Sequence, residues 1–132
     1  MSIIELITTI NAPIEHCFEL KLSVDAHLQS TANTQERALK GRKNGILELG
    51  EEITWQAKHF GIWQTLTVKI VEMNTPVYFC DEMIRGIFKK MRHEHYFQFI
   101  DNQTIMKDIF YFQSPFGGIG KLFNYLFLEN YM

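Results

Sequence analysis

Apolar and polar positions divide the chain into a strand-rich middle with helices on either side. The first stretch, Ile3–Ile10, is rich in β-branched residues and predicts a strand. Proline is well tolerated in the first turn of a helix, so Pro13 indicates a helix that extends to about Leu20. Ser23 can cap a second short helix from Val24 to about Gln29.

The middle of the chain predicts a run of strands joined by short turns. Its apolar segments are rich in β-branched and aromatic residues, and Gly, Asn, Asp and Pro separate them. Strands joined by turns this short can pair only as antiparallel neighbours. The predicted strands are Glu36–Leu39, which is the weakest, Glu51–Phe60, Ile62–Met73, Val77–Ile84, Met91–Ile100 and Thr104–Gln113.

The hydrophobic period changes near the end of the chain. Apolar residues there follow the spacing i, i+3, i+4, i+7, i+8, which is typical of an amphipathic helix. They are Ile119, Leu122, Phe123, Leu126 and Phe127. One strand, two short helices, a run of strands and a long helix predict an α+β fold, with the last helix packed on one face of an antiparallel sheet.

Composition limits the classes of protein and of partner. The 132 residues suit one domain, and a net charge of -2 with a pI of about 6.2 argues against nucleic-acid binding. The short basic runs Lys40–Lys43 and Lys89–Arg92 are interpreted as solvated turns. No signal peptide and no membrane span are visible, and Cys17 and Cys80 are expected as free buried thiols, so we expect a soluble cytoplasmic protein.

Four stretches carry a resemblance to a known superfamily. They read INAPIEHCFEL, GEEITWQAKHFGI, FCDEMIRGIFKKMRHEHYF and TIMKDIFYFQSPFGGIGKLF. Together with the order of elements they resemble bacterial single-domain members of the START/Bet v1-like superfamily, also called SRPBCC or polyketide cyclase/dehydratase-like. The resemblance covers essentially all of residues 1–132. It implies a helix-grip fold, in which a curved antiparallel sheet with two short helices after strand 1 is closed over an internal cavity by a long C-terminal helix.

In the superfamily the last helix usually continues for several turns past a Tyr-Met pair. Here the chain stops at Tyr131-Met132, so the resemblance implies a lid helix of about 14 residues. A lid this short would leave apolar area exposed and slightly favours self-association, so a homodimer is possible.

Strand alternation assigns residues to the inner face of the sheet, because side chains at i and i+2 share one side. The inner face is largely apolar and carries a few polar groups, which is the usual make-up of a small-molecule site. The predicted ligand-binding residues, with two from the last helix, are Trp55, His59, Gln64, Leu66, Val68, Phe79, Asp81, Met83, His93, His95, Phe97, Met106, Asp108, Phe110, Phe123 and Phe127.

Three interpretations of the polar residues His93, His95, Asp81 and Asp108 stay open. Two histidines at i and i+2 with a carboxylate could chelate a metal ion. A His beside an Asp in an apolar pocket could act as an acid or base, which makes these four residues the catalytic candidates. The interpretation we favour is that they satisfy one another across strands and orient a ligand, with no metal and no cofactor.

Three functional hypotheses follow. The first is binding of a hydrophobic or amphipathic small molecule, such as a lipid, a polyketide-like ring or an isoprenoid. The second is an enzyme of the cyclase/dehydratase kind, and the sequence leans away from catalysis because no nucleophile motif is present. The third is an interaction protein, since some bacterial relatives carry labels connected with cell division.

Overall fold

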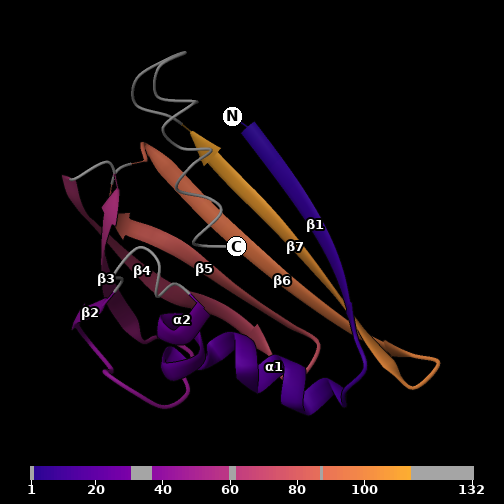
Figure 1. Cartoon of the computed structure of the whole chain (residues 1–132). Helices are drawn as coiled ribbons and strands as arrows, with labels where there is room; N and C mark the ends of the chain where they lie inside the picture. Colours follow the sequence, from indigo (N-terminus) through magenta and orange to yellow (C-terminus); the bar gives the residue numbers. More distant parts are fainter. Residues whose placement is uncertain (1, 31–36, 60–61, 87, 114–132) are drawn as a thin grey trace.

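A curved antiparallel sheet with two short helices forms the part of the chain that the structure describes (Figure 1). The computed structural model describes residues 2–30, 37–59, 62–86 and 88–113. For residues 30, 37, 57–59 and 62 it describes the backbone only. The elements are β1 (Ser2–Ile10), α1 (Ile14–Leu22), α2 (Val24–Ser30), β2 (Arg37–Lys40), β3 (Glu52–His59), β4 (Ile62–Asn74), β5 (Tyr78–Arg85), β6 (Lys90–Ile100) and β7 (Gln103–Gln113). The predicted strands and the two predicted short helices are confirmed, with ends that differ by at most two residues.

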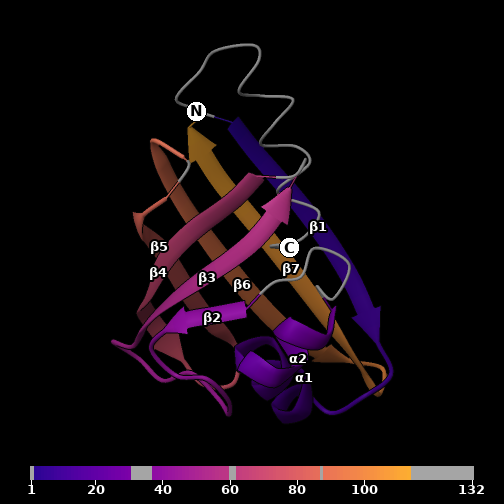
Figure 2. The same cartoon turned by 60° about the vertical axis from the view of Figure 1, so that its left-hand side comes forward.

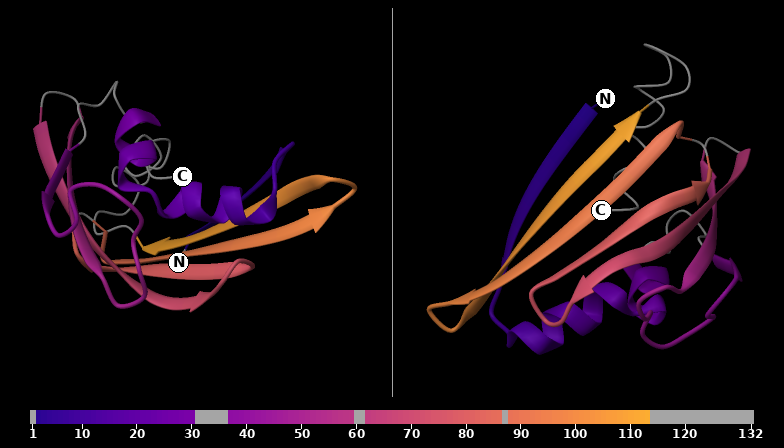
Figure 3. Two further views of the ribbon diagram at one scale, coloured as in Figure 1. Left: turned by 90° about the horizontal axis from the view of Figure 1, so that it is seen from below. Right: turned by 180° about the vertical axis from the view of Figure 1, so that it is seen from behind.

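The seven strands lie in the order β1-β7-β6-β5-β4-β3-β2, and every pair is antiparallel. Strands β2 to β7 therefore follow the chain from neighbour to neighbour, and β1 joins the far edge beside β7. The sheet bends, so that β2 and β3 curl toward the helices (Figure 2). Seen from below, α1 and α2 lie on the concave side (Figure 3). The concave side is thus the place where a site can be enclosed.

The second helix begins at a cap that the sequence predicts. The backbone N–H of Ala26 donates a hydrogen bond to the Oγ atom of Ser23 at 3.2 Å, which satisfies one of the free N–H groups of the first turn. Ser23 also forms an isolated antiparallel bridge with Ile46. The start of α2 is therefore tied to the loop that precedes β3.

Helix α1 is held on the sheet by aromatic packing. The Phe18 ring contacts the rings of Phe79 and Phe97 edge-on, with centroids 5.5 and 5.3 Å apart. All three side chains are buried. Burial of a side chain of this size contributes about 1.5–3 kcal/mol. The first helix is thus fixed over strands β5 and β6.

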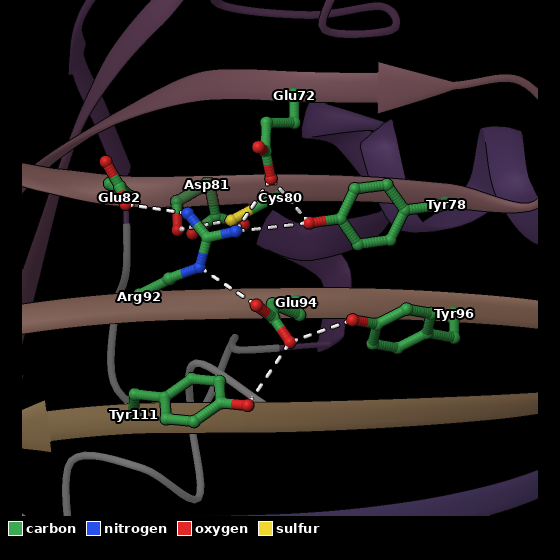
Figure 4. A network of polar contacts seen from close by, with 9 residues as sticks. All are labelled: Glu72, Tyr78, Cys80, Asp81, Glu82, Arg92, Glu94, Tyr96 and Tyr111. Atoms are coloured by element: carbon green, nitrogen blue, oxygen red, sulfur yellow. Dashed lines mark hydrogen bonds and ion pairs between the residues drawn. The ribbon is translucent and has the colours of Figure 1, made fainter.

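The convex face carries a polar network around Arg92 (Figure 4). Its guanidinium contacts the carboxylates of Glu72, Glu82 and Glu94 at 2.7, 2.8 and 2.9 Å. The helices lie behind the strands in this view, so the network faces away from them. The interpretation of Lys89–Arg92 as a solvated turn is therefore wrong for Arg92, because this residue lies within β6 and is half-buried among carboxylates.

The predicted C-terminal helix, with its lid and its apolar residues, lies outside the described residues. Within the described part of the chain, none of the helices is both long enough and apolar enough to cross a bilayer. Cys17 and Cys80 are free and buried, as predicted.

Candidate functional site

A cavity of about 650 Å³ lies between the concave face of the sheet and the two helices. Its wall is mostly aliphatic and aromatic, with polar side chains from both the sheet and the helices. The lining residues among those described are Ile10, Leu20, Lys21, Leu22, Ser23, Ala26, His27, Gln29, Leu47, Trp55, Leu66, Val68, Ile70, Phe79, Asp81, Met91, His93, His95, Met106 and Phe110. Its size and make-up match the usual range of small-molecule sites.

Nine of the residues predicted for ligand binding line this cavity. They are Trp55, Leu66, Val68, Phe79, Asp81, His93, His95, Met106 and Phe110. Strand register explains why they meet, because Asp81 pairs with His93 and His93 with Phe110 in one row across three strands. In the next row Phe79 pairs with His95. The alternation argument therefore found the correct face of each of these strands.

Four other predicted residues are described but do not line the cavity. Asp108 lies behind the histidines and is 1% exposed, and Phe97 packs under Phe18. Met83 lines a separate hollow with Arg92 and Tyr111, next to a register shift between β4 and β5 that alternation could not foresee. Gln64 is half-buried on β4 near its start.

Three predicted positions have no described side chain. His59 ends β3, and only its backbone pairing with Ile62 is described. Phe123 and Phe127 fall in the predicted last helix, outside the described residues. Their part in ligand binding stays a prediction.

Asp81, His93 and His95 of the wall form a polar cluster with Asp108 behind them. His93 Nε2 lies 3.1 Å from Asp108 Oδ1, and His95 Nε2 lies 2.9 Å from Asp81 Oδ2. Both contacts are diagonal, since the register places His93 opposite Asp81 and His95 opposite Asp108. The two imidazole rings stack with centroids 3.7 Å apart. Asp108 therefore lies close to both histidines, whereas Asp81 contacts His95.

Two atoms of this polar cluster are buried without a hydrogen-bond partner among the described residues. One is His95 Nδ1, which lies 2.9 Å from Asp108 Oδ1 but outside hydrogen-bond geometry. The other is Asp108 Oδ2, whose near cation is Lys21 Nζ at 3.8 Å. Buried polar atoms are rarely left unpaired, so the cluster has capacity for one more interaction.

The environment moves the pKa values of the two histidines in opposite directions. Burial, helped by the charge of His95, lowers the pKa of His93 more than the hydrogen bond to Asp108 raises it. Burial also acts to lower the pKa of His95, but Asp108 and Asp81 outweigh it and raise that pKa. For Asp108, burial acts to raise the pKa, and the two histidines overcome it, so that the pKa lies well below its ordinary value. The cluster therefore favours protonation of His95 over protonation of His93, and it favours the ionised form of Asp108.

Sequence reasoning missed the polar residues that the helices add to the wall, among them Lys21 and His27. Lys21 on α1 reaches toward Asp108, and the His27 ring on α2 lies against Trp55 with centroids 4.0 Å apart. A signal for Lys21 was available, because it lies three and four residues after the buried Phe18 and Cys17 on the same helical face. No comparable signal pointed to His27.

This arrangement offers two kinds of chemistry. The cluster can exchange hydrogen bonds with the polar end of a bound molecule, because both histidines and Asp81 reach the cavity wall. Asp81, His93 and His95 also each offer one metal-ligating atom, and these three atoms lie within 4.8 Å of one another.

Comparison with known proteins gives structural likeness at low sequence identity. No protein-family model and no curated protein matches the chain. Among solved structures, the protein TTHA0849 from Thermus thermophilus has a TM-score of 0.73 at 12% identity, covering 98% of this chain and 86% of that one.

Two further solved structures share this shape. Major latex-like protein 151 from Panax ginseng has a TM-score of 0.68 at 13% identity, covering 98% of this chain and 91% of that one. Ara h 8.0201 has a TM-score of 0.65 at 15% identity, covering 89% and 80%. The chain therefore has a Bet v1-like fold, as its sequence resemblance predicted.

Proposed function

We propose that the protein binds a hydrophobic or amphipathic small molecule in the cavity on the concave side of the sheet. The observation that carries this proposal is the cavity of about 650 Å³, whose wall is largely apolar and includes the neighbouring polar side chains of Asp81, His93 and His95. Such a wall suits a molecule with an apolar body and one polar end. Lipids, polyketide-like rings and isoprenoids all fit this description.

The polar cluster would orient the polar end of the molecule. Its carboxylates already hold the two histidines by buried contacts, so the cluster is rigid before a ligand arrives. Preorganised groups lose little entropy on binding and therefore favour one orientation of the ligand.

The test is titration of the purified, delipidated protein with cis-parinaric acid, a fluorescent amphipathic probe. We expect saturable binding of one probe per chain. Ala26→Phe on α2 places a ring in the cavity and should weaken binding at least several-fold, because Ala26 lines the wall. The matched control is Gln98→Phe, which adds the same ring at an exposed position on β6. Equal affinity of the folded Ala26→Phe variant and the wild type would contradict the proposal.

A second candidate function is acid–base catalysis of the cyclase/dehydratase kind. The observation in its favour is that His93 and His95, neighbours at one cavity wall, have pKa values displaced in opposite directions. Paired groups displaced in this way can serve as a base and an acid. A His93→Gln variant that keeps probe affinity but loses turnover of a cognate ligand would favour catalysis, and unchanged turnover would exclude it for this residue.

Homodimer formation, an interaction role and a cytoplasmic location stay predictions. The lid residues on which the first two depend lie outside the described part of the chain.

A further inference from the structure

We propose that Asp81, His93 and His95 form a binding site for one divalent metal ion of the Zn²⁺ or Fe²⁺ class at the wall of the cavity. The sequence alone favoured a cluster without metal. The three-dimensional arrangement supports the opposite conclusion for three reasons: the donor set, the charge balance and the second layer of contacts.

The donor set is two imidazoles and one carboxylate, with one ligating atom of each within 4.8 Å of the others. The two histidines are buried, and Asp81 is only partly exposed. This combination suits Zn²⁺ or non-haem Fe²⁺ better than Mg²⁺ or Ca²⁺, which prefer oxygen ligands. Three protein ligands also leave at least one coordination position open, as in catalytic zinc sites.

One distance in the cluster suits a shared cation. His95 Nε2 and Asp81 Oδ2 are 2.9 Å apart. The distance is that of an ordinary N–H···O hydrogen bond, in which a proton lies between the two atoms. A metal ion that replaces this proton, with bonds of about 2.1 Å to both atoms, would enclose an angle of roughly 90°, and a small separation of the two atoms would open that angle toward the tetrahedral value.

The charge balance leaves room for a divalent ion. Within the cluster itself, the carboxylates of Asp81 and Asp108 are balanced by at most one imidazolium, which leaves a net charge of -1, while Lys21 lies 3.8 Å from Asp108 and is partly exposed. A divalent ion that replaces the proton shared by His95 and Asp81 brings the net charge of these four side chains and the ion to zero. Burial makes such compensation valuable, because an unpaired charge is costly in a low dielectric.

Asp108 is placed to accept the hydrogen bonds that metal-binding histidines usually donate from the ring nitrogen that does not ligate the ion. Its Oδ1 atom lies 3.1 Å from His93 Nε2 and 2.9 Å from His95 Nδ1. If both nitrogens carry protons toward Asp108, the other nitrogen of each ring is left to ligate the ion. A carboxylate that accepts from a ligating histidine fixes the ring and raises its basicity. This role also gives His95 Nδ1, now without a hydrogen bond, a partner after a small rotation of the ring.

The site stands on its own geometry and does not depend on the proposed ligand. Because all three ligands line the cavity, an open coordination position of the ion could take an oxygen atom from the polar end of the ligand when both are present. The metal would then act as the orienting group, with the apolar wall holding the rest of the molecule.

The experiment uses untagged protein, freed of metal with EDTA and then exchanged into chelator-free buffer. Titration with Co²⁺, followed by visible absorption and competed with Zn²⁺, should give one ion per chain. Asp81→Asn and His93→Gln should each weaken Co²⁺ binding more than tenfold, whereas the control His16→Gln, at an exposed position on α1, should bind as the wild type does. Circular dichroism checks that each variant is folded.

The proposal is overturned if the wild type binds no Co²⁺ at one per chain, or if folded Asp81→Asn binds as tightly as the wild type. Asp81→Asn is decisive even if His93→Gln fails to fold, because Asp81 is the least buried of the three ligands. Binding of cis-parinaric acid is measured separately in EDTA. Probe binding without metal, and metal binding without probe, therefore test the two proposals independently.

Discussion

The Nε2 atom of His95 lies 2.9 Å from Oδ2 of Asp81, on the neighbouring strand and at the wall of the cavity. This contact joins β5 to β6 in addition to their backbone hydrogen bonds, and it lies between a buried and a partly buried side chain. A contact of this kind serves the fold and the site together, so that changes to it affect stability and binding at once. Stability measurements must therefore accompany every binding measurement on the cluster.

Replacing Asp108 by Ala should strongly destabilise the protein. Asp108 is the common neighbour of both histidines and of Lys21, and its removal leaves a buried imidazolium with one carboxylate fewer. Loss of one partner of a buried ion pair typically costs about 3–5 kcal/mol. Urea denaturation gives the free energy of unfolding.

Glu5→Ala is the matched control for Asp108→Ala. It removes an ion pair with Lys107 in which both side chains are largely exposed, and such pairs contribute about 0–1 kcal/mol. Similar losses for Asp108→Ala and Glu5→Ala would show that the buried cluster is energetically unimportant.

The two histidines should give the stability of metal-free protein opposite dependences on pH. His95 has a folded-state pKa above its unfolded value, so its contribution is fully present below about pH 6.5 and is lost as pH rises through the folded pKa. The destabilisation caused by His95→Gln should therefore be larger at about pH 6 than at about pH 9.

For His93 the sign is reversed. Its folded-state pKa is lowered, so the unfolded chain binds the proton more readily and the folded state loses stability as pH falls below about 6.5. His93→Gln should remove this loss of stability at low pH. Urea denaturation of both variants in EDTA between about pH 5 and pH 9 measures the two slopes, and slopes of the same sign would contradict the assignment.

Thr54 and Thr67 form a buried hydroxyl pair on adjacent strands, 2.7 Å apart and 9% and 5% exposed. Replacing either one by Val leaves the other hydroxyl buried without its partner, which should cost about 1–3 kcal/mol. The double variant removes both hydroxyls and should be nearly as stable as the wild type. A double-mutant cycle in urea checks this, and additive losses would mean that the two hydroxyls do not interact.

Substitutions at Gly41 and Gly50 distinguish two costs of adding a side chain, the strain of a positive φ and a steric clash. Both have positive φ, +86° and +87°, so Ala at either position should cost about 1–2 kcal/mol. At Gly41 a Cβ would also lie 2.3 Å from the backbone oxygen of Glu52, whereas Gly50 has open space. Gly41→Ala should therefore destabilise the protein more than Gly50→Ala, and equal thermal stabilities would refute the close approach.

Local pattern was enough to predict the strands and the inner face. Alternation placed Asp81, His93 and Phe110 on one side, and the register confirms that they share a row. It worked because side chains alternate strictly along a regular strand. Alternation predicted the inner face less well where strands shift register, as between β4 and β5 at Met83.

Contacts that depend on tertiary packing could not be predicted in the same way. The diagonal pairing of His95 with Asp81 depends on rotamers in a crowded cluster, which sequence does not specify. Lys21 reaches Asp108 only because α1 is fixed over the sheet by Phe18. Arg92 was misread for a related reason, since its three carboxylate partners come from three different strands.

The place of β1 beside β7 affects how the chain can fold during synthesis. Ser2 pairs with Phe112 and Ile10 with Thr104, so β1 leaves the ribosome long before the strand that it pairs with. Until then β1 is an unpaired edge carrying Ile3 and Ile7, both exposed even in the finished sheet. Pairings so distant in sequence slow folding. The nascent chain therefore passes through a period in which this apolar strand is open to wrong partners, and chaperone demand should be greatest before β7 emerges.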